Sequence, residues 1–294
     1  MADDFDRPID LSNEERALVV EKKATCPFIA SAVAERQLHV RNSVDDPLAS
    51  IEEVRLLGNT GGGDLGEFLV LFARGNHARA RGASGMLDQL IPGHLFSLDF
   101  PGSQGSHPGH SGILQGNPGE LNSGRFSAAD FERLIERAED GWIERSEVGR
   151  FIAENLIKDP ESKVLGRETI EMFGIDLKDF AESVVSHLRE KLFGSDEDAD
   201  AAQREAERRL AGLARNDNLV GSAGEFGLLF AFLAHRPDAK EDAVSVNDLR
   251  MMFVDKRLPD GWETWEKKRV DWVTSTTALI FSAGKEYLKL KRAN

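Results

Sequence analysis

Cysteine is almost absent from this chain, since Cys26 is the only one among 294 residues. A single cysteine excludes an intramolecular disulfide and any zinc or iron–sulfur site built from several cysteines. No stretch approaches the roughly 18 apolar residues that a membrane-spanning helix needs. The first residues, MADDFDRPID, lack the basic and apolar regions of a secretory signal. We therefore expect a cytoplasmic protein with no membrane partner.

Positive charge is also in short supply. The chain has 37 lysines and arginines against 51 aspartates and glutamates, which gives a formal net charge of −14. Nucleic-acid-binding proteins present a basic face, and the only basic stretch here is the short one from Lys285 to Arg292. The composition therefore predicts no nucleic-acid partner and is typical of an acidic, soluble protein.

Alternating strand patterns are hard to find, whereas apolar residues at helical spacing are common. The length suits one large domain or two ordinary ones. We expect a single all-α domain over residues 1–294, with an N-terminal extension over 1–24 and a C-terminal helix over 263–294. The predicted helices are Leu11–Lys23, Phe28–Leu38, Gly66–Arg74, Ala128–Arg137, Ser146–Ile157, Leu177–Phe193, Ala199–Arg215, Glu225–His235, Val246–Asp255 and Arg269–Leu290.

Two segments rich in glycine interrupt the helical pattern. Residues 58–66 lack the Gly-Lys-Ser/Thr ending of a phosphate-binding loop, which favours a plain connection between helices. Residues 97–125 are rich in Gly, Pro, Ser and His, and loops of that length in compact domains are usually functional or disordered. Because this loop keeps apolar residues and places His107 three positions before His110, we expect an ordered loop that helps to form a site.

Two short segments of the chain, Gly63–Ala73 and Gly221–Ala231, are similar in sequence, because both contain Gly-Glu-Phe followed by apolar residues. The simplest interpretation is one good helix start used twice. Glu225 would then lie in the first turn of its helix, where a carboxylate complements the helix dipole.

Cys26 is followed directly by Pro27 and an apolar helical stretch. Proline prefers the first helical position, so Cys26 is predicted at or next to the N-cap. Unpaired backbone N–H groups and the positive end of the dipole would face the sulfur, which lowers a thiol pKa. Such a thiolate can ligate a metal or haem iron, or act as a nucleophile. The alternative is a buried and inert cysteine.

At two places the sequence resembles the haem-thiolate peroxidase and peroxygenase family, the chloroperoxidase-like proteins. Cys26-Pro27, with Ile29 and Leu38 behind it, resembles the family's Cys-Pro segment. Val246–Phe253 followed by Lys256–Trp262 is similar to its closing segment, which has the pattern FF, then ERLP, then GW. The order and separation of the two segments also fit. The resemblance implies the chloroperoxidase fold and a divergent bacterial-type member.

The resemblance further implies haem b with Cys26 as the axial ligand, and a reaction between peroxide and a small organic substrate. Thiolate donation promotes cleavage of the peroxide O–O bond. The family's distal acid–base group is often a glutamate, so the candidates are Glu168 and Glu171, with His107 and His110 as rivals. The apolar candidates for the haem pocket are Pro27, Phe28, Ile29, Phe68, Leu71, Phe72 and Phe100.

The sequence departs from the family pattern in two ways. The family's Glu-His-Asp tripeptide, whose acid binds magnesium near a haem propionate, is missing. The corresponding region is the 97–125 loop, where Glu120 is the candidate ligand for a divalent cation, Mg²⁺ or Ca²⁺. The Asn-His-Gly of the family's Cys-Pro helix is replaced by Ala34-Glu35-Arg36. A relative that binds haem without catalysis is therefore an open alternative.

Residues 136–147 carry a partial EF-hand pattern. Four residues fall at positions 5, 6, 8 and 12 of a calcium-binding loop: Asp140, Gly141, Ile143 and Glu147. The first-position aspartate is missing, and residues 239–248 repeat the pattern more faintly. A calcium-binding helical protein is thus a second alternative, and a thiol peroxidase using Cys26 is a third. The sequence leaves the oligomeric state open.

Overall fold

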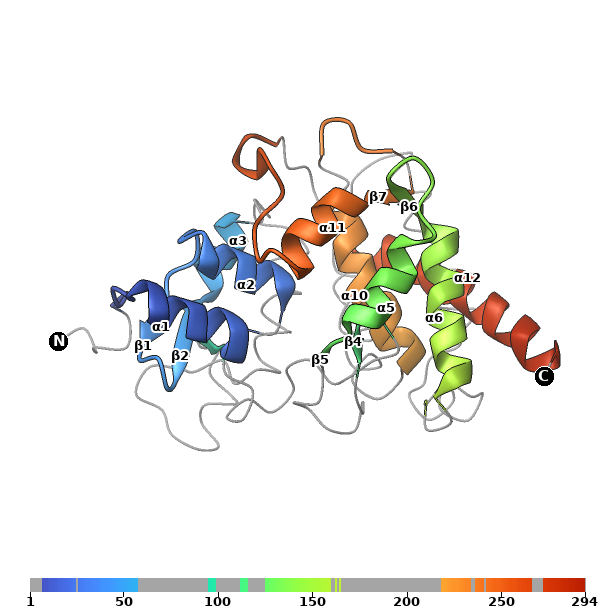
Figure 1. The fold of residues 1–294 in the computed structure, drawn as a ribbon, viewed down its shortest axis with the longest axis horizontal. Helices are drawn as coiled ribbons and strands as arrows, with labels where there is room; N and C mark the ends of the chain where they lie inside the picture. The colour runs from blue at the N-terminus through green and yellow to red at the C-terminus, as the bar shows by residue number, and fades with distance from the viewer. Residues whose placement is uncertain are drawn as a thin grey trace, which may run out of the picture.

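The computed structural model describes residues 7–24, 26–57, 95–98, 112–115, 125–159, 162, 164, 218–233, 236–240, 242–265 and 272–293. Helices dominate this part of the chain (Figure 1), which confirms the predicted mainly helical fold. Short strands accompany them, so the expectation of a strictly all-α chain was wrong. Among the described helices, none has the length and apolarity to cross a membrane.

The helices are α1 (Asn13–Leu18), the π-helix η2 (Val19–Lys23), α2 (Pro27–Ala34), α3 (Ile51–Leu57), α5 (Ala128–Ile135), α6 (Arg145–Lys158), α10 (Asn218–Leu233), α11 (Val246–Phe253), the 3₁₀ turn η4 (Trp262–Thr264) and α12 (Trp272–Ala293). Strands β1 (Arg41–Asn42), β2 (Pro47–Ser50) and β3 (Leu95–Ser97) form one antiparallel sheet. Two further antiparallel pairs join β4 (Leu114–Gln115) to β5 (Arg125–Phe126), and β6 (Trp142–Glu144) to β7 (Ala243–Ser245).

Serine residues are the N-caps of three of these helices. Ser12 and Glu15 form a reciprocal capping box at α1, while Ser127 and Ser245 accept hydrogen bonds from the third residue of α5 and α11. Each cap satisfies a backbone N–H that the helix itself leaves unpaired. The predicted helices that fall in the described part are therefore confirmed to within a few residues, except the one predicted over Glu225–His235, which begins earlier, at Asn218. Those predicted over 66–74, 177–193 and 199–215 lie outside the described residues.

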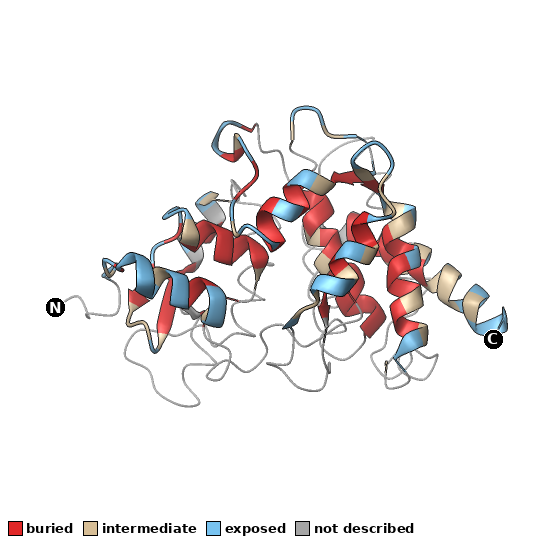
Figure 2. Cartoon of the chain, viewed as in Figure 1, coloured by how far each residue is buried: buried red, intermediate tan, exposed pale blue. Residues whose placement is uncertain are grey.

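Helices α6, α10 and α12 pack against one another to form the core of the C-terminal half, and their facing sides are buried (Figure 2). Glycines permit this close packing. A Cβ atom on Gly149 of α6 would lie 2.3 Å from Ser282 Oγ of α12, and one on Gly227 of α10 would lie 2.2 Å from Thr276 Oγ1. Only a residue without a side chain allows the helix axes to approach this closely.

The β6–β7 pair joins two similar units, α5–β6–α6 and α10–β7–α11. Ile143 lies opposite Val244 at the centre of the pair. Beyond it, the N–H of Arg145 donates to the Asp242 carbonyl at 2.8 Å, and the N–H of Val246 donates to the Gly141 carbonyl at 2.9 Å. Because the same bond forms on both sides, the two units are related by an approximate two-fold axis.

Helix α2 lies beside α11 and the end of α10, and so connects the N-terminal half to this core (Figure 1). The Ser31 hydroxyl is 3.4 Å from the Met252 carbonyl of α11. Leu11 and Val19 are buried against the same region. The segment that we expected as an N-terminal extension thus contributes side chains to the core.

Candidate functional site

Cys26 is the N-cap of α2, as Pro27 predicted. Its backbone is extended (φ −65°, ψ 120°), Pro27 takes the first helical position, and the Cys26 carbonyl accepts from the Ala30 N–H at 2.8 Å. The backbone N–H groups of Phe28 and Ile29 act on the sulfur without completing a capping hydrogen bond. The local geometry therefore matches the expectation from the sequence.

The pKa of the Cys26 thiol moves in the direction opposite to our expectation. Burial raises it most, and the nearby negative charge of Glu225 raises it further. The N–H groups of Ile29 and Phe28 lower it, by less than burial raises it but by more than Glu225 does, and the charge of Lys256 lowers it least. Desolvation outweighs the helix dipole here, so the expected thiolate was wrong for the protein alone. The raised pKa favours the neutral thiol over the thiolate.

Glu225 is the most unusual charged residue of the described structure. Both of its carboxyl oxygens are buried and lack a hydrogen-bond partner, and burial raises the pKa of Glu225 to about 8. The Leu114 N–H opposes that rise but lies outside full hydrogen-bonding geometry. Buried carboxyl groups are normally paired, and a strongly raised pKa in a protein interior is typical of functional sites.

The sequence alone predicted a different position for Glu225, in the first turn of its helix. Helix α10 begins at Asn218, so Glu225 lies in its interior and the predicted first-turn position was wrong. The available signal was the apolarity of residues 218–233 on every side, which is typical of a wholly buried helix. A carboxylate within such a helix has to be buried too.

Lys256 is the second charged group that acts on the sulfur. It follows α11 with φ at +54°, and its ammonium donates to the Phe253 carbonyl at 2.8 Å and faces the Phe126 ring at 5.6 Å. Burial lowers the pKa of Lys256, and the charge of Cys26 raises it. Cys26, Glu225 and Lys256 come from three separate elements, and the charges of Glu225 and Lys256 both act on Cys26.

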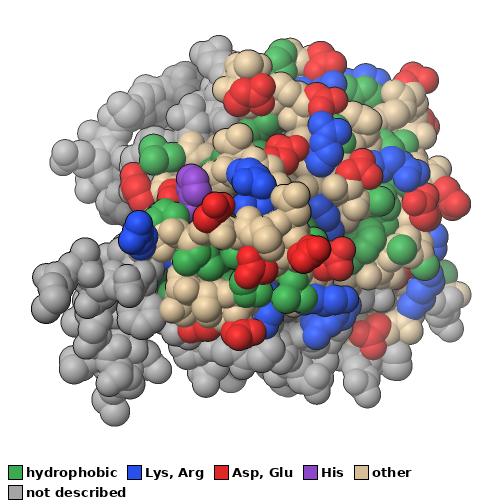
Figure 3. All heavy atoms as spheres, turned by 60° about the vertical axis from the view of Figure 1, so that its left-hand side comes forward, with side chains coloured by type: hydrophobic (Ala, Val, Ile, Leu, Met, Phe, Trp, Pro, Cys, Tyr) green, Lys and Arg blue, Asp and Glu red, His purple; other side chains and the backbone are tan. Residues whose placement is uncertain are grey.

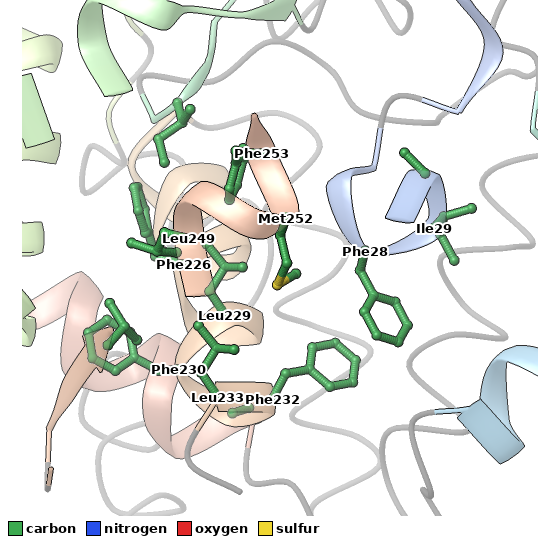
Figure 4. Close-up of a cluster of buried hydrophobic side chains, with 14 of the residues drawn as sticks. Phe28, Ile29, Phe226, Leu229, Phe230, Phe232, Leu233, Leu249, Met252 and Phe253 are labelled. Carbon is green, nitrogen blue, oxygen red and sulfur yellow. The ribbon is translucent and has the colours of Figure 1, made fainter. Parts of the chain in front are cut away.

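Aromatic and aliphatic side chains surround these groups. Phe28 stacks on Phe232 with ring centroids 4.7 Å apart and meets Trp262 at 5.5 Å. Figure 4 shows Phe28, Phe232 and Met252 extending from α2, α10 and α11 into the region between these helices. The described side chains packed around Cys26 are therefore mainly apolar.

The structure describes four of the residues predicted for the site: Cys26, Pro27, Phe28 and Ile29. The last three are buried around the half-buried cysteine. The other predicted site residues lie outside the described residues; they are Phe68, Leu71, Phe72, Phe100, His107, His110, Glu120, Glu168 and Glu171.

The EF-hand pattern of residues 136–147 adopts a tight hairpin turn. Asp140 and Gly141 both have positive φ, at 52° and 80°, which is the type I′ geometry favoured by Asp-Gly. Glu139 and Trp142 exchange two backbone hydrogen bonds of 2.9 Å across the turn. The Trp142 carbonyl, which would be the seventh-position calcium ligand, is therefore already engaged.

The carboxylates at the twelfth position of both patterns are paired with arginine. Glu147 meets Arg137 at 3.4 Å, and Asp248 meets Arg236 at 2.6 Å. Within the described ranges, no group of three or more His, Cys, Asp and Glu residues is placed to hold a metal ion. This geometry does not favour calcium at either loop.

Comparisons of the chain with protein-family models, with curated proteins and with solved structures find no match. What the protein does must therefore be inferred from its own residues. The strongest starting point is the set formed by Cys26, Glu225 and Lys256 with their apolar surroundings, because the charges of Glu225 and Lys256 both act on the Cys26 thiol.

Proposed function

We propose that this chain is a haem-thiolate oxidoreductase that uses peroxide to oxidise or oxygenate a small organic substrate. The observation that carries the proposal is Glu225, whose buried carboxyl oxygens have no hydrogen-bond partner among the described residues and whose charge raises the pKa of Cys26. A cysteine that served packing alone would gain nothing from a buried carboxyl beside it. A thiol and a proton-transfer group placed together are what peroxide chemistry requires.

The residues present fit a haem b. Cys26 offers a sulfur donor at a helix N-cap, while Phe28 and Ile29 provide buried apolar surface beside it. The raised thiol pKa is compatible with this role, because a coordinated metal deprotonates a thiol outright. Haem bound through Cys26 would supply the oxidising chemistry, with thiolate donation favouring cleavage of the peroxide O–O bond.

Glu225 would move the proton that this chemistry needs. With a pKa of about 8, its carboxyl is mostly protonated at neutral pH and is able to exchange a proton with a peroxide oxygen. The stacked rings of Phe28 and Phe232 exclude water on the same side of α10. Glu168, Glu171, His107 and His110 remain candidates for the same role from outside the described residues.

The other expectations belong to this proposal as well. We propose a cytoplasmic protein with a small-molecule substrate, peroxide as oxidant and no nucleic-acid partner. On the face drawn in Figure 3, the described acidic and basic side chains are interspersed. The proposal that no nucleic acid binds rests on the net charge of −14. A divalent cation held by Glu120 is part of the same proposal.

The first test is the visible absorption spectrum of the purified protein, supplied with haem, reduced and exposed to carbon monoxide. We expect a strongly red-shifted Soret band that is lost in Cys26→Ala. Ser31→Ala on the same helix is the matched control and should keep the band. A band at the histidine-type position would move the ligand to a histidine, and no band at all would overturn the proposal.

Activity is the second test. In Glu225→Gln, peroxide-dependent oxidation of an organic donor should fall by about a hundredfold or more, while the red-shifted Soret band remains. A Soret band without activity in the wild-type protein would instead favour non-catalytic haem binding. Peroxide consumption without any chromophore would favour the thiol peroxidase and contradict the haem proposal.

A further inference from the structure

Residues 112–115 lie directly against the carboxyl of Glu225. A Cβ atom on Gly112 would be 2.8 Å from Glu225 Oε2 and 3.4 Å from the Phe226 ring. Real side chains essentially never make the shorter contact, so only glycine fits here without displacing the carboxyl. Two residues further on, the Leu114 N–H is, among the described residues, the backbone donor that acts on Glu225. The segment therefore limits both the position of this carboxyl and its access to polar groups.

The same segment is anchored along its length. The Ile113 carbonyl accepts from the Ser127 N–H at 3.0 Å, and Leu114 pairs with Phe126 through β4 and β5. Ile113 and Leu114 are both buried. These contacts attach the segment to the start of α5, so it is not free to move away from α10.

A buried polar contact also fixes Gly112 itself. Asn155 of α6 donates through Nδ2 to the Gly112 carbonyl at 3.5 Å, and its Oδ1 accepts from Arg133 at 2.6 Å. Arg133 is in turn paired with Asp130 at 2.6 Å. Helices α5 and α6 thus hold Gly112 through Asn155, which is itself buried.

We propose that Gly112–Leu114, held by Asn155, is a positioning segment that sets the orientation and hydration of the Glu225 carboxyl. The proposal rests on the proposed role of Glu225 in proton transfer. Gly112 and Asn155 are positioning residues, because they act on the reaction only through Glu225. The segment packs the carboxyl on the side facing residue 112 and leaves it one weak donor, the Leu114 N–H.

Gly112→Ala tests the packing part of this proposal. The added methyl group should push the carboxyl away from the Leu114 N–H and place apolar atoms against it, so the pKa of Glu225 should rise by about one unit. The readout is the infrared band of the protonated carboxyl, assigned with Glu225→Gln and followed as a function of pH. Gly149→Ala places a Cβ atom even closer to its neighbour, 2.3 Å from Ser282 Oγ, but away from Glu225; it is the control for general strain and should leave the midpoint unchanged.

Asn155→Leu tests the anchor, and its expected effect has the opposite sign. Without the Nδ2 donor the segment should loosen, water should reach the carboxyl, and the titration midpoint should fall by about one unit. The Leu114 amide should also exchange its hydrogen at least about ten times faster. This variant decides the question if Gly112→Ala fails to fold.

Three results would overturn the proposal: midpoints that stay at the wild-type value in both variants, shifts of the same sign, or an equal shift in Gly149→Ala. Cys26 and Lys256 are the other titratable groups coupled to this site, so the measurements are repeated with Lys256→Met. All of them use the protein without added haem. A missing Soret band would therefore refute the proposed function and leave this test intact. In haem-loaded protein, the pH profile of the activity should move with the midpoint, while KM for the organic donor stays constant.

Discussion

The two units joined by β6 and β7 share one backbone plan and handle charge differently. In α5–β6–α6, the carboxylates lie at the surface or near it, and Arg137 pairs with both Glu147 and Glu154. In α10–β7–α11, Asp248 is 0% exposed and Glu225 has no partner. The first unit shows that this fold is stable with its carboxylates paired near the surface. The second unit keeps two carboxylates buried, which lowers stability, and one of them is Glu225, the residue that we propose for proton transfer.

The largest expected effect comes from removing the arginine of the second unit. Arg236→Ala leaves the Asp248 carboxylate buried without its guanidinium partner, and breaking a buried pair in this way costs about 3–5 kcal/mol. Unfolding in urea measures the loss. Arg250→Ala breaks an exposed pair with Glu132 at 3.2 Å and should cost less than about 1 kcal/mol. Equal losses in the two variants would mean that Asp248 is solvated after all.

The next effect is a pH dependence that belongs to Glu225. Its folded pKa of about 8 lies above the ordinary value of 4.5, so it stabilises the fold below about pH 4.5. That contribution is lost as pH rises toward 8, by on the order of 1 kcal/mol per pH unit. The free energy of unfolding of Glu225→Gln, relative to that of the wild type, should therefore increase as the pH rises from about 4.5 to 8.

Denaturant unfolding at several pH values measures this gain. Ser222→Ala is the control, because Ser222 is also buried and unpartnered on α10 but does not ionise. Its difference from wild type should not change with pH. A flat difference for Glu225→Gln would show that the carboxyl is hydrated in solution.

The matching turn residues of the two units, Gly141 and Asp242, should show a smaller effect on stability. Gly141 has φ +80° with open space around it, so Gly141→Ala should cost about 1 kcal/mol through backbone strain alone. At the matching place in the second unit, Asp242 has φ +57°. Asp242→Gly should relieve strain there, although it also removes an ion pair with Arg145 at 2.7 Å. Thermal unfolding of both variants should show a clear loss in the first and a change close to zero in the second.

The smallest expected effect is that of calcium. Because arginines already pair with Glu147 and Asp248, calorimetry with Ca²⁺ should give no binding heat and thermal unfolding should stay unchanged. The result that contradicts this is saturable heat that disappears in Glu147→Gln. It would revive the calcium-binding alternative.

Local signals in the sequence predicted local structure well. Pro27 placed Cys26 at an N-cap, because this effect depends on neighbours within a few residues. The thiol pKa could not be predicted in the same way. It depends on burial by residues from α10 and α11, which no short segment specifies.

The same limit explains the strands and the buried carboxylate. Strands of two to four residues, such as β6, carry too little alternation to be recognised. Glu225 was assigned to a helix start because its glycine neighbours suggested one, whereas the helix extends from Asn218. The raised pKa of Glu225 results from burial in the tertiary structure, where α10 packs against Gly112 and α2, and local sequence does not specify this burial.

The β6–β7 pair also bears on how the protein folds. Ile143 and Val244 are about a hundred residues apart in the chain, so bringing them together costs the entropy of closing a long loop. Pairings of this kind form slowly compared with single helices. The helices of each unit should therefore form first, and strands β6 and β7 should pair late. Since that closure sets α10 beside α6, the environment of Glu225 should be among the last features of the native protein to appear.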